Sequence, residues 1–242
     1  MKTIITTTLL LLSNVLIAQT GPAGVGTNDG TSSLKLWFRP DFGLTTTGTE
    51  VDAWQNGAGV AAHDLTSTGA NRPSVVTASV NGYDELNFVG GDYMQISGAL
   101  TTSNFITDQA SSFVMQQRLA ITNNWVYATS PHQTDRFSCH ISWGNGNVYF
   151  DIGGCCSAQT RMQLNGLGGL NNYSYWSFDA SNSAGKQLYR NGNLLQSRNY
   201  TQTYTSHGTH TFRIGESTNG NITEIIIFNQ RINSAQRLII EN

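Results

Sequence analysis

The chain has 242 residues, of which 12% are charged, and its formal net charge is −2 at pH 7. That length fits one large all-β domain or at most two small ones. A chain with so little charge has no basic surface for a polyanion, which argues against a nucleic-acid partner. Its polar surface must come from Asn, Thr, Ser, Gln and Gly. Such a surface is common among exported proteins that meet neutral polysaccharide, and equally among extracellular β proteins that do not.

The first 18 residues predict a secretory signal peptide. Lys2 supplies a short basic start, an apolar stretch runs from Ile4 to Ile17, and Ala18 precedes Gln19. The apolar stretch is shorter than the roughly 20 residues that a membrane span needs. We therefore expect cleavage after Ala18 and a soluble mature protein that is extracellular or at the cell surface, with no transmembrane segment. A retained N-terminal anchor is the alternative.

The remainder of the chain predicts one strand-rich domain. Residues 19–32 are rich in glycine and lack periodicity, so we expect a flexible lead-in. Over residues 33–242, short apolar runs alternate with clusters of Gly, Asn, Asp and Ser, which is typical of a sandwich or barrel. The predicted strands are Leu34–Arg39, Glu85–Phe88, Tyr93–Ile96, Ser112–Leu119, Trp125–Thr129, Phe137–Trp143, Val148–Ile152, Arg161–Leu164, Tyr175–Asp179, Gln187–Arg190, Thr211–Ile214 and Glu224–Phe228.

The last quarter of the chain predicts a hairpin and a helix. The runs KQLYR and NLLQS are joined by Asn-Gly at 191–192, the strongest short-range sign of a tight β-hairpin. Helical character is confined to the segment after Asn233. We expect Asn233 or Ser234 to be the N-cap, and Leu238 and Ile239 to face inward.

Six segments together resemble a known family, through their order and spacing. They are LKLWFRPDFG, VDAWQNGAG, NRPSVV, ELNFVGGDYMQI, KQLYRNGNLL and EIIIFNQRINSAQRLIIE. Through them, residues 33–242 resemble the laminin-G-like branch of the concanavalin A-like lectin/glucanase superfamily, and more closely its modules in large cell-surface proteins of Bacteroidota-type bacteria. The resemblance implies an all-β fold, a two-sheet antiparallel jelly-roll sandwich with one short C-terminal helix.

The resemblance leaves the activity open. Its members include lectins, adhesion modules, hydrolases and lyases, so the fold does not choose among them. The ligands of the family are often carbohydrates or proteins. Its C-terminal helix usually runs on into more chain, which suggests that this domain belongs to a longer multidomain protein.

A second predicted hairpin, between Phe137 and Ile152, carries the main candidates for a binding site. A two-residue Asn-Gly turn at 145–146 would set its register. The predicted pairs are Trp143 with Val148, Ile141 with Phe150 and Cys139 with Ile152 on the core face, and Ser142 with Tyr149 and His140 with Asp151 on the polar face. We expect the Asp151 carboxylate to orient the His140 imidazole and to raise its pKa.

This polar face has two interpretations. In the first it binds a glycan: His140 and Asp151 bond to sugar hydroxyls, and Tyr149 offers a ring face. Arg118 and Arg161 would be outer members if their strands neighbour the hairpin. In the second interpretation, His140 and Asp151 are an ordinary polar cross-strand pair that faces solvent.

Two further positions are candidate ligand residues. Trp125 opens a strand beside a polar loop, where its ring could stack on a ligand. Asp92, in GGDYMQI, occupies a position where related domains place a loop acid, so the resemblance makes it a candidate Ca²⁺ ligand. No run of oxygen ligands resembles a dedicated calcium loop, and a solvated turn residue is the alternative.

The chain has three cysteines, and an odd number leaves at least one thiol unpaired within the molecule. On the predicted register Cys139 does not face the loop that holds Cys155 and Cys156. This favours a vicinal disulfide between Cys155 and Cys156, with Cys139 as a buried free thiol. A bridge from Cys139 to one of the pair is the alternative.

Catalysis is disfavoured by what the sequence lacks. A retaining glycosidase needs two carboxyl groups about 5 Å apart. The nearest match to the family's acidic strand motif begins at Glu50 and Asp52 but has Gln55 in the last acidic position. We therefore expect a secreted, non-catalytic carbohydrate-binding or adhesion module, whose partner is a glycan or a cell-surface protein. The alternatives are a structural spacer of a larger surface protein and a divergent polysaccharide hydrolase or lyase.

Overall fold

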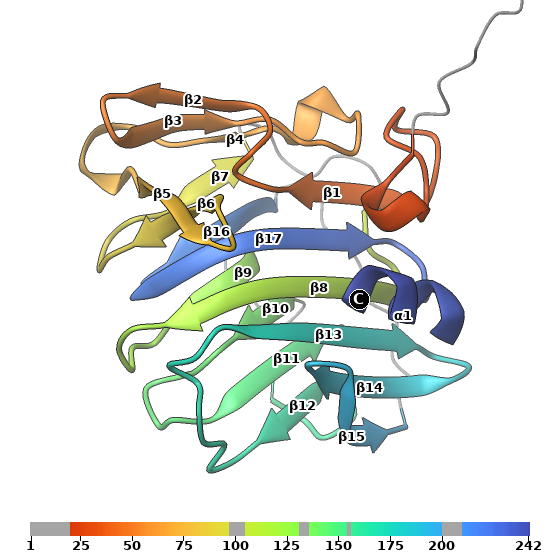
Figure 1. Cartoon of the computed structure of the whole chain (residues 1–242). Coiled ribbons are helices and arrows are strands. Elements are labelled where there is room, and N and C mark those ends of the chain that lie inside the picture. The colour runs from red at the N-terminus through yellow and green to blue at the C-terminus, as the bar shows by residue number, and fades with distance from the viewer. Residues whose placement is uncertain (1–19, 97–104, 131–135, 154–155, 200–209) are drawn as a thin grey trace, which may run out of the picture.

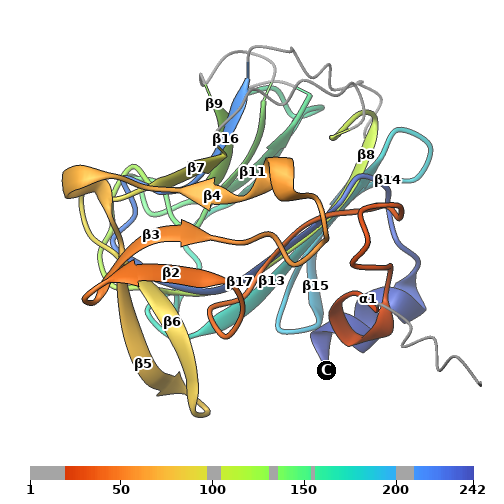
Figure 2. The same ribbon diagram turned by 90° about the horizontal axis from the view of Figure 1, so that it is seen from above.

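The computed structural model describes residues 20–96, 105–130, 136–153, 156–199 and 210–242. The predicted signal peptide lies outside these residues. All pairings between the described strands are antiparallel, and the strands form two packed layers (Figures 1 and 2). The fold is thus the all-β jelly-roll sandwich with one short C-terminal helix that the sequence predicts.

The front layer of Figure 1 is built around a long central strand, β17 (Gly220–Phe228). This strand pairs with β6 through its first half and with β1 through its second half, and β8 covers its other edge. The other strands of this layer are β1 (Leu34–Phe38), β5 (Ser74–Val80), β6 (Tyr83–Phe88), β8 (Gln109–Arg118), β13 (Ser174–Ser181), β14 (Gly185–Arg190) and β15 (Asn193–Arg198).

The back layer has nine described strands, and it meets the front layer where Glu50 of β3 pairs with Ser74 of β5. Its strands are β2 (Leu44–Thr47), β3 (Glu50–Trp54), β4 (Leu65–Thr66), β7 (Met94–Ile96), β9 (Trp125–Ser130), β10 (Phe137–His140), β11 (Val148–Ile152), β12 (Arg161–Leu164) and β16 (Thr211–Glu216). Short 3-10 turns η2 (Ala61–His63) and η3 (Gly69–Asn71) flank β4.

The main core lies between the layers. Phe150 of β11 stacks on Phe178 of β13 with ring centroids 5.2 Å apart, so the two layers are in direct contact there. Trp54 and Trp176 are fully buried in the same cluster. Each such side chain stabilises the fold by about 1.5–3 kcal/mol relative to an exposed one.

A second, smaller core lies on the outer face of the front layer, under α1 (Ser234–Glu241) and η1 (Pro22–Gly24). Residues 20–32, predicted as a flexible lead-in, contain η1 and a bridge between Thr20 and Thr27. The buried members of this second core are Val25, Leu34, Trp37, Ala58, Phe113, Ile226, Phe228 and Ile232.

The terminal helix begins as predicted but turns a different side inward. Asn233 is the N-cap and forms a capping box with Gln236. Leu238 and Ile239 are 47% and 52% exposed, so the expectation that they face inward is wrong. Arg237 is buried instead, with its guanidinium 3.8 Å from the Tyr189 ring centroid. The inward side of the helix therefore holds Arg237, which lies over the Tyr189 ring, and Ile240, which packs against the second core.

Predicted strands agree with the structure where hydrophobic alternation is strong. The hairpin at 191–192 joins β14 to β15, and positive φ angles of 50° and 75° at Asn191 and Gly192 fit a type I′ turn. The strands β2 to β5 were not predicted. β2 and β5 are largely exposed and β4 has two residues, so these three strands show no clear apolar period. The strand predicted for Phe137–Trp143 ends at His140.

Candidate functional site

The polar residues of the β10–β11 hairpin share a face, but in a different register from the predicted one. His140 pairs with Tyr149 and Ser138 pairs with Asp151, so the expected direct pairing of His140 with Asp151 is wrong. The shift is by an even number of residues, and each side chain therefore keeps its predicted face. Cys139 and Phe150 still point into the main core.

The connection between β10 and β11 accounts for one residue of this two-residue shift, and the other falls in the irregular segment between His140 and Trp143. The backbone N–H of Trp143 donates to the carbonyl of Asn147 at 2.8 Å, and the N–H of Gly146 donates to the carbonyl of Trp143 at 2.7 Å. These bonds close a three-residue loop in which Gly146 has a φ of 81°, instead of the predicted two-residue turn. The longer connection moves the pairing along β11.

Asp151 is clamped by two arginines on this face. Arg161, its direct partner on β12, donates from Nε to Oδ1 at 2.6 Å and from Nη2 to Oδ2 at 2.8 Å. Arg136 donates to Oδ2 from Nε at 2.9 Å and from Nη2 at 2.6 Å. Burial raises the pKa of Asp151, but the Arg161 hydrogen bond and the charges of both arginines outweigh it, so the pKa lies below its ordinary value.

His140 is buried beside this clamp, with 1% of the residue exposed. Its Nδ1 lies 2.6 Å from the carbonyl of Asn124, and its Nε2 lies 3.3 Å from the Ser138 hydroxyl and 3.9 Å from Asp151. Burial lowers its pKa to about 3 and outweighs the attraction of Asp151. The expected rise in the pKa of His140 is therefore wrong, because loss of hydration disfavours the imidazolium more than one shared carboxylate favours it.

Next to these residues lies a cavity of about 270 Å³, here called the arginine pocket. The described residues that line it are Arg136, His140, Trp143, Asn145, Tyr149, Cys156 and Arg161. With His140 neutral, its two arginines and the Asp151 that they clamp give a formal charge of +1. The pocket therefore combines positive charge, amide and aromatic surfaces at one place.

Three aromatic rings cluster beside this pocket, and two of them line it. Trp125 and His140 lie with ring centroids 4.2 Å apart, and Trp143 lies 5.0 Å from His140 and 5.6 Å from Trp125. Trp143, which the register predicted to lie in the core, is half-buried and lines the pocket because it falls outside β10. Trp125 is 9% exposed and packs behind the other two rings. It supports the pocket and is not among its lining residues.

Tyr149 is held at both its ring and its hydroxyl. The guanidinium of Arg161 lies 4.3 Å from its ring centroid, and its hydroxyl accepts hydrogen bonds from the side-chain amides of Asn145 at 2.7 Å and Asn147 at 3.2 Å. Arg161 thus covers one face of the ring that the sequence assigned to a sugar. Through its hydroxyl, Tyr149 holds in place the loop that carries Trp143 and Asn145.

The remaining predicted ligand residues lie apart from this pocket. Arg118 ends β8 in the front layer, so its strand does not neighbour the hairpin, although its Nη1 donates to Ser142 Oγ at 2.7 Å. Asp92 accepts a hydrogen bond from the Val89 N–H at 2.8 Å within its own turn. Among the described residues no group of three or more His, Cys, Asp or Glu side chains could hold a metal ion, so nothing there supports the calcium expectation.

The cysteine prediction is tested in part. Cys139 is a buried free thiol, as expected. Burial raises its pKa well above the ordinary value, so the reactive thiolate is disfavoured. Cys155 lies outside the described residues, and its pairing with Cys156 stays a prediction that mass spectrometry of the unreduced protein can test.

Sequence reasoning missed Arg136 and Asn145 as pocket residues. Arg136 has the same parity along the chain as Ser138 and His140, so continuing the alternation by one step would have placed it on their face. Asn145 was assigned only to a turn. Its contact with Tyr149 depends on the longer loop, which the Asn-Gly pattern does not predict.

Comparisons with known proteins show the fold. No family model matches the chain, and no curated protein matches its sequence. Domain 4 of AbnA, a GH43 extracellular arabinanase from Geobacillus stearothermophilus, solved with arabinotriose, is 12% identical over 86% of this chain and 97% of its own, with a TM-score of 0.58.

Two further structures are similar over part of their length. The ligand binding domain of botulinum neurotoxin serotype D, in complex with N-acetylneuraminic acid, is 14% identical over 91% of this chain and 52% of its own, with a TM-score of 0.62. Trypanosoma rangeli sialidase in complex with sialic acid is 11% identical over 86% of this chain and 32% of its own, with a TM-score of 0.53. At such identities the likeness extends to the β-sandwich and no further.

In the part of the chain that the structure describes, no helix has the length and apolar character needed to cross a bilayer.

Proposed function

We propose that this protein is a secreted, non-catalytic carbohydrate-binding module that holds a glycan in the arginine pocket. The observation that carries the proposal is the lining of this pocket, where Trp143 and Asn145 of the β10–β11 loop meet Arg161 of β12. Ligand sites of this kind combine an apolar or aromatic wall with a few convergent polar groups. Carbohydrate ligands bound to structures of the same fold support the choice of ligand class.

The pocket suits a sugar through two complementary surfaces. The half-buried Trp143 ring offers a flat apolar face for the C–H side of a sugar ring. Asn145 is exposed at the rim, and its side-chain amide has a second N–H, beyond the one donated to Tyr149, that can bond a hydroxyl. The formal charge of +1 favours a saccharide that carries a carboxylate over a neutral one.

The same geometry argues against acyl-transfer chemistry at this face. Ser138, His140 and Asp151 lie within 3.9 Å of one another, as a catalytic triad would require. However, Ser138 is fully buried, and Nδ1 of His140 faces the Asn124 carbonyl instead of the carboxylate. Neither Ser138 nor Asp151 lines the arginine pocket, so a substrate held there does not meet the Ser138 hydroxyl, and the two residues support the pocket from behind His140.

A glycan-array screen of residues 19–242, with and without calcium, tests the proposal. We expect binding that Trp143→Ala and Asn145→Ala each weaken by about fivefold or more, the effect of losing one stacking or hydrogen-bonding contact. Asn193→Ala is the matched control, because Asn193 is also an exposed hairpin asparagine and lines no described pocket. If no glycan binds in either condition, the proposal fails, and the spacer interpretation replaces it.

A further inference from the structure

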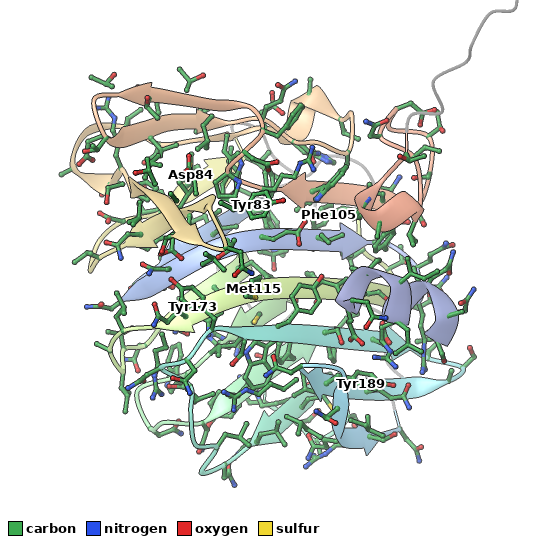
Figure 3. The ribbon with its side chains drawn as sticks, in the orientation of Figure 1. Tyr83, Asp84, Phe105, Met115, Tyr173 and Tyr189 are labelled. Atoms are coloured by element: carbon green, nitrogen blue, oxygen red, sulfur yellow. The ribbon has the colours of Figure 1, made fainter. Side chains whose placement is uncertain are left out.

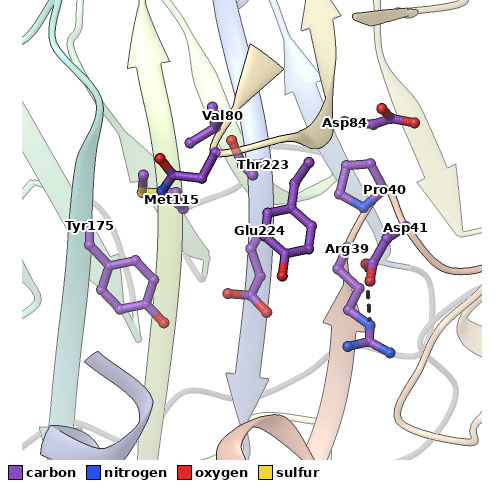
Figure 4. A pocket seen from close by; sticks show the side chains of 11 residues that line it. Arg39, Pro40, Asp41, Val80, Asp84, Met115, Tyr175, Thr223 and Glu224 are labelled. Atoms are coloured by element: carbon purple, nitrogen blue, oxygen red, sulfur yellow. Dashed lines mark ion pairs between the residues drawn. The ribbon is translucent and has the colours of Figure 1, made fainter. Parts of the chain in front are cut away.

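A second cavity, of about 340 Å³, lies on the outer face of the front layer (Figure 4). It is here called the acidic pocket. Its lining includes residues from the end of β1, the β5–β6 hairpin, and strands β8, β13 and β17. The residues that matter for its chemistry are Arg39, Asp41, Asp84, Tyr175, Thr223 and Glu224. Figure 3 shows Tyr83 and Asp84 of the β5–β6 hairpin in the same part of the layer as Met115.

The floor of this pocket is a row of cross-strand neighbours. Met115 of β8 pairs with Tyr175 of β13 on one side and with Glu224 of β17 on the other. The three side chains therefore stand side by side on one face of the sheet, as Figure 4 shows. Further along these strands the same face is covered by α1 and η1, which pack on Phe113 and Ile226. The row formed by Tyr175, Met115 and Glu224 thus lies at the edge of the surface that α1 and η1 cover.

Two hydroxyl groups in this pocket are buried and unbonded. The oxygens of Tyr175 and Thr223 are inaccessible and have no hydrogen-bond partner among the described residues. Leaving a buried polar group without a partner costs about 1–3 kcal/mol, so each such group calls for an explanation. Both residues line the pocket, and an occupant with hydroxyl groups would supply the missing partners.

The charges of this pocket are the reverse of those in the arginine pocket. The lining holds three acids, Asp41, Asp84 and Glu224, and one base, Arg39, so the formal charge is −2 with all three acids ionised. Arg39 is engaged already, because it lies 3.4 Å from Asp41 and 4.5 Å from the Trp37 ring centroid. Glu224 accepts a hydrogen bond from Trp37 Nε1 at 2.9 Å. This arrangement repels an anion and offers acceptors to hydroxyl donors.

We propose that the acidic pocket is a second carbohydrate site, which takes one neutral sugar ring. The ring stacks its C–H face on Met115 and Tyr175, while its hydroxyls donate to Glu224 and bond with the hydroxyls of Tyr175 and Thr223. A cation is the weaker fit, because Arg39 lies in the lining and because the two unbonded hydroxyls need a partner that can both donate and accept. The site goes beyond the proposed function and does not require the arginine pocket to be occupied.

Nuclear magnetic resonance titration of residues 19–242 tests this assignment, with arabinotriose as the neutral probe, N-acetylneuraminic acid as the anionic probe and lysine as the cationic probe. We expect arabinotriose to shift the backbone amide signals of Met115, Tyr175 and Glu224. Tyr175→Phe and Glu224→Gln should each weaken this binding by about fivefold, the effect of one lost hydrogen bond. Tyr189→Phe is the matched control, because its hydroxyl bonds to Gln187 at 2.9 Å outside both pockets.

The outcomes separate this inference from the proposed function. If arabinotriose leaves the three amide signals unmoved, or if it binds Tyr175→Phe and Glu224→Gln as tightly as the wild type, the acidic pocket is no sugar site. If lysine alone moves these signals, the ligand class is wrong. Loss of N-acetylneuraminic acid binding in Trp143→Ala concerns the arginine pocket and leaves the acidic pocket as proposed.

Discussion

The arginine pocket and the acidic pocket lie on different layers of the sandwich and differ in how their polar groups are bonded. In the arginine pocket, Asp151 is saturated by two guanidinium groups and His140 is neutral and buried. In the acidic pocket, the hydroxyls of Tyr175 and Thr223 have no described partner. His140 and Asp151, the residue types that suggest a functional site in the sequence, are thus bonded within the fold. The hydroxyls of Tyr175 and Thr223, which the sequence does not single out, are left available to a ligand.

The difference matters for how each pocket would recognise a ligand. The arginine pocket owes its shape to a buried ionic cluster, and its contact surface is the rim formed by Trp143 and Asn145. The acidic pocket owes its shape to a row of neighbouring strands, and its contact surface is the floor itself. Substitutions in the ionic cluster should therefore affect stability, whereas substitutions at the rim of the arginine pocket and at the floor of the acidic pocket should affect ligand binding.

The largest expected effect is on the stability of the arginine pocket. Asp151→Asn leaves Arg136 and Arg161 partly buried without a counter-charge, and breaking such a pair costs about 3–5 kcal/mol. We expect the free energy of unfolding, measured in urea at pH 7, to fall by that amount. Asp41→Asn is the control, since its pair with Arg39 is 43% and 41% exposed and is worth less than about 1 kcal/mol. Equal effects of the two substitutions would contradict the comparison.

The next effect concerns pH. The pKa of His140 is about 3 in the folded protein and 6.5 in the unfolded chain, so as pH falls below 6.5 the unfolded chain takes up the proton first. His140 therefore costs the fold about 2.5 kcal/mol between pH 7 and pH 4.5. We expect His140→Gln to lose that much less stability than the wild type over this range in urea unfolding. Parallel pH profiles for the two proteins would show that His140 is not buried and neutral.

A smaller effect should distinguish the charges of the two pockets. Attraction between exposed charges is screened over about 10 Å at 0.1 M salt and over about 3 Å at 1 M. Raising sodium chloride from about 0.05 M to 0.5 M should weaken the binding of N-acetylneuraminic acid severalfold, and that of arabinotriose by less than about twofold. Calorimetric titration at the two concentrations measures both. Equal salt dependence would mean that charge does not separate the pockets.

The smallest effect is on stability in the acidic pocket. Because the Tyr175 hydroxyl is buried with no partner among the described residues, Tyr175→Phe removes the cost of an unpaired polar group and should raise the free energy of unfolding by about 1 kcal/mol. Tyr189→Phe removes a bond to Gln187 and should cost about 1 kcal/mol. Thermal and urea unfolding compare the two. A larger cost for Tyr175→Phe than for Tyr189→Phe would show that the Tyr175 hydroxyl is bonded in the protein.

The sequence predicts the sandwich well where local patterns carry enough information. The Asn-Gly hairpin between β14 and β15 and the N-cap at Asn233 follow from short-range chemistry, and both agree with the structure. The inward side of α1 does not, because Arg237 is buried through Tyr189 and Asp179, which lie on strands of the front layer. The pattern of apolar residues within the helix carries no information about those partners, so it cannot predict that Arg237 is buried.

The candidate sites were predictable to different extents. Alternation alone keeps Ser138, His140, Tyr149 and Asp151 on one face, and that grouping is present despite the shifted register. The acidic pocket depends on the order β13–β8–β17, which places Tyr175, Met115 and Glu224 in one row. Residues so far apart in the chain meet through the sheet order, and one sequence does not specify that order.

Binding of a saccharide in the arginine pocket is the central claim, and calorimetric titration of N-acetylneuraminic acid into residues 19–242 and into Trp143→Ala tests it most directly. We predict saturable binding to the wild type, the same affinity in Asn193→Ala, and an affinity at least about fivefold lower in Trp143→Ala, with the fold of each variant checked by circular dichroism. Unchanged affinity in a folded Trp143→Ala variant, or no binding of any array saccharide to the wild type, would contradict the claim.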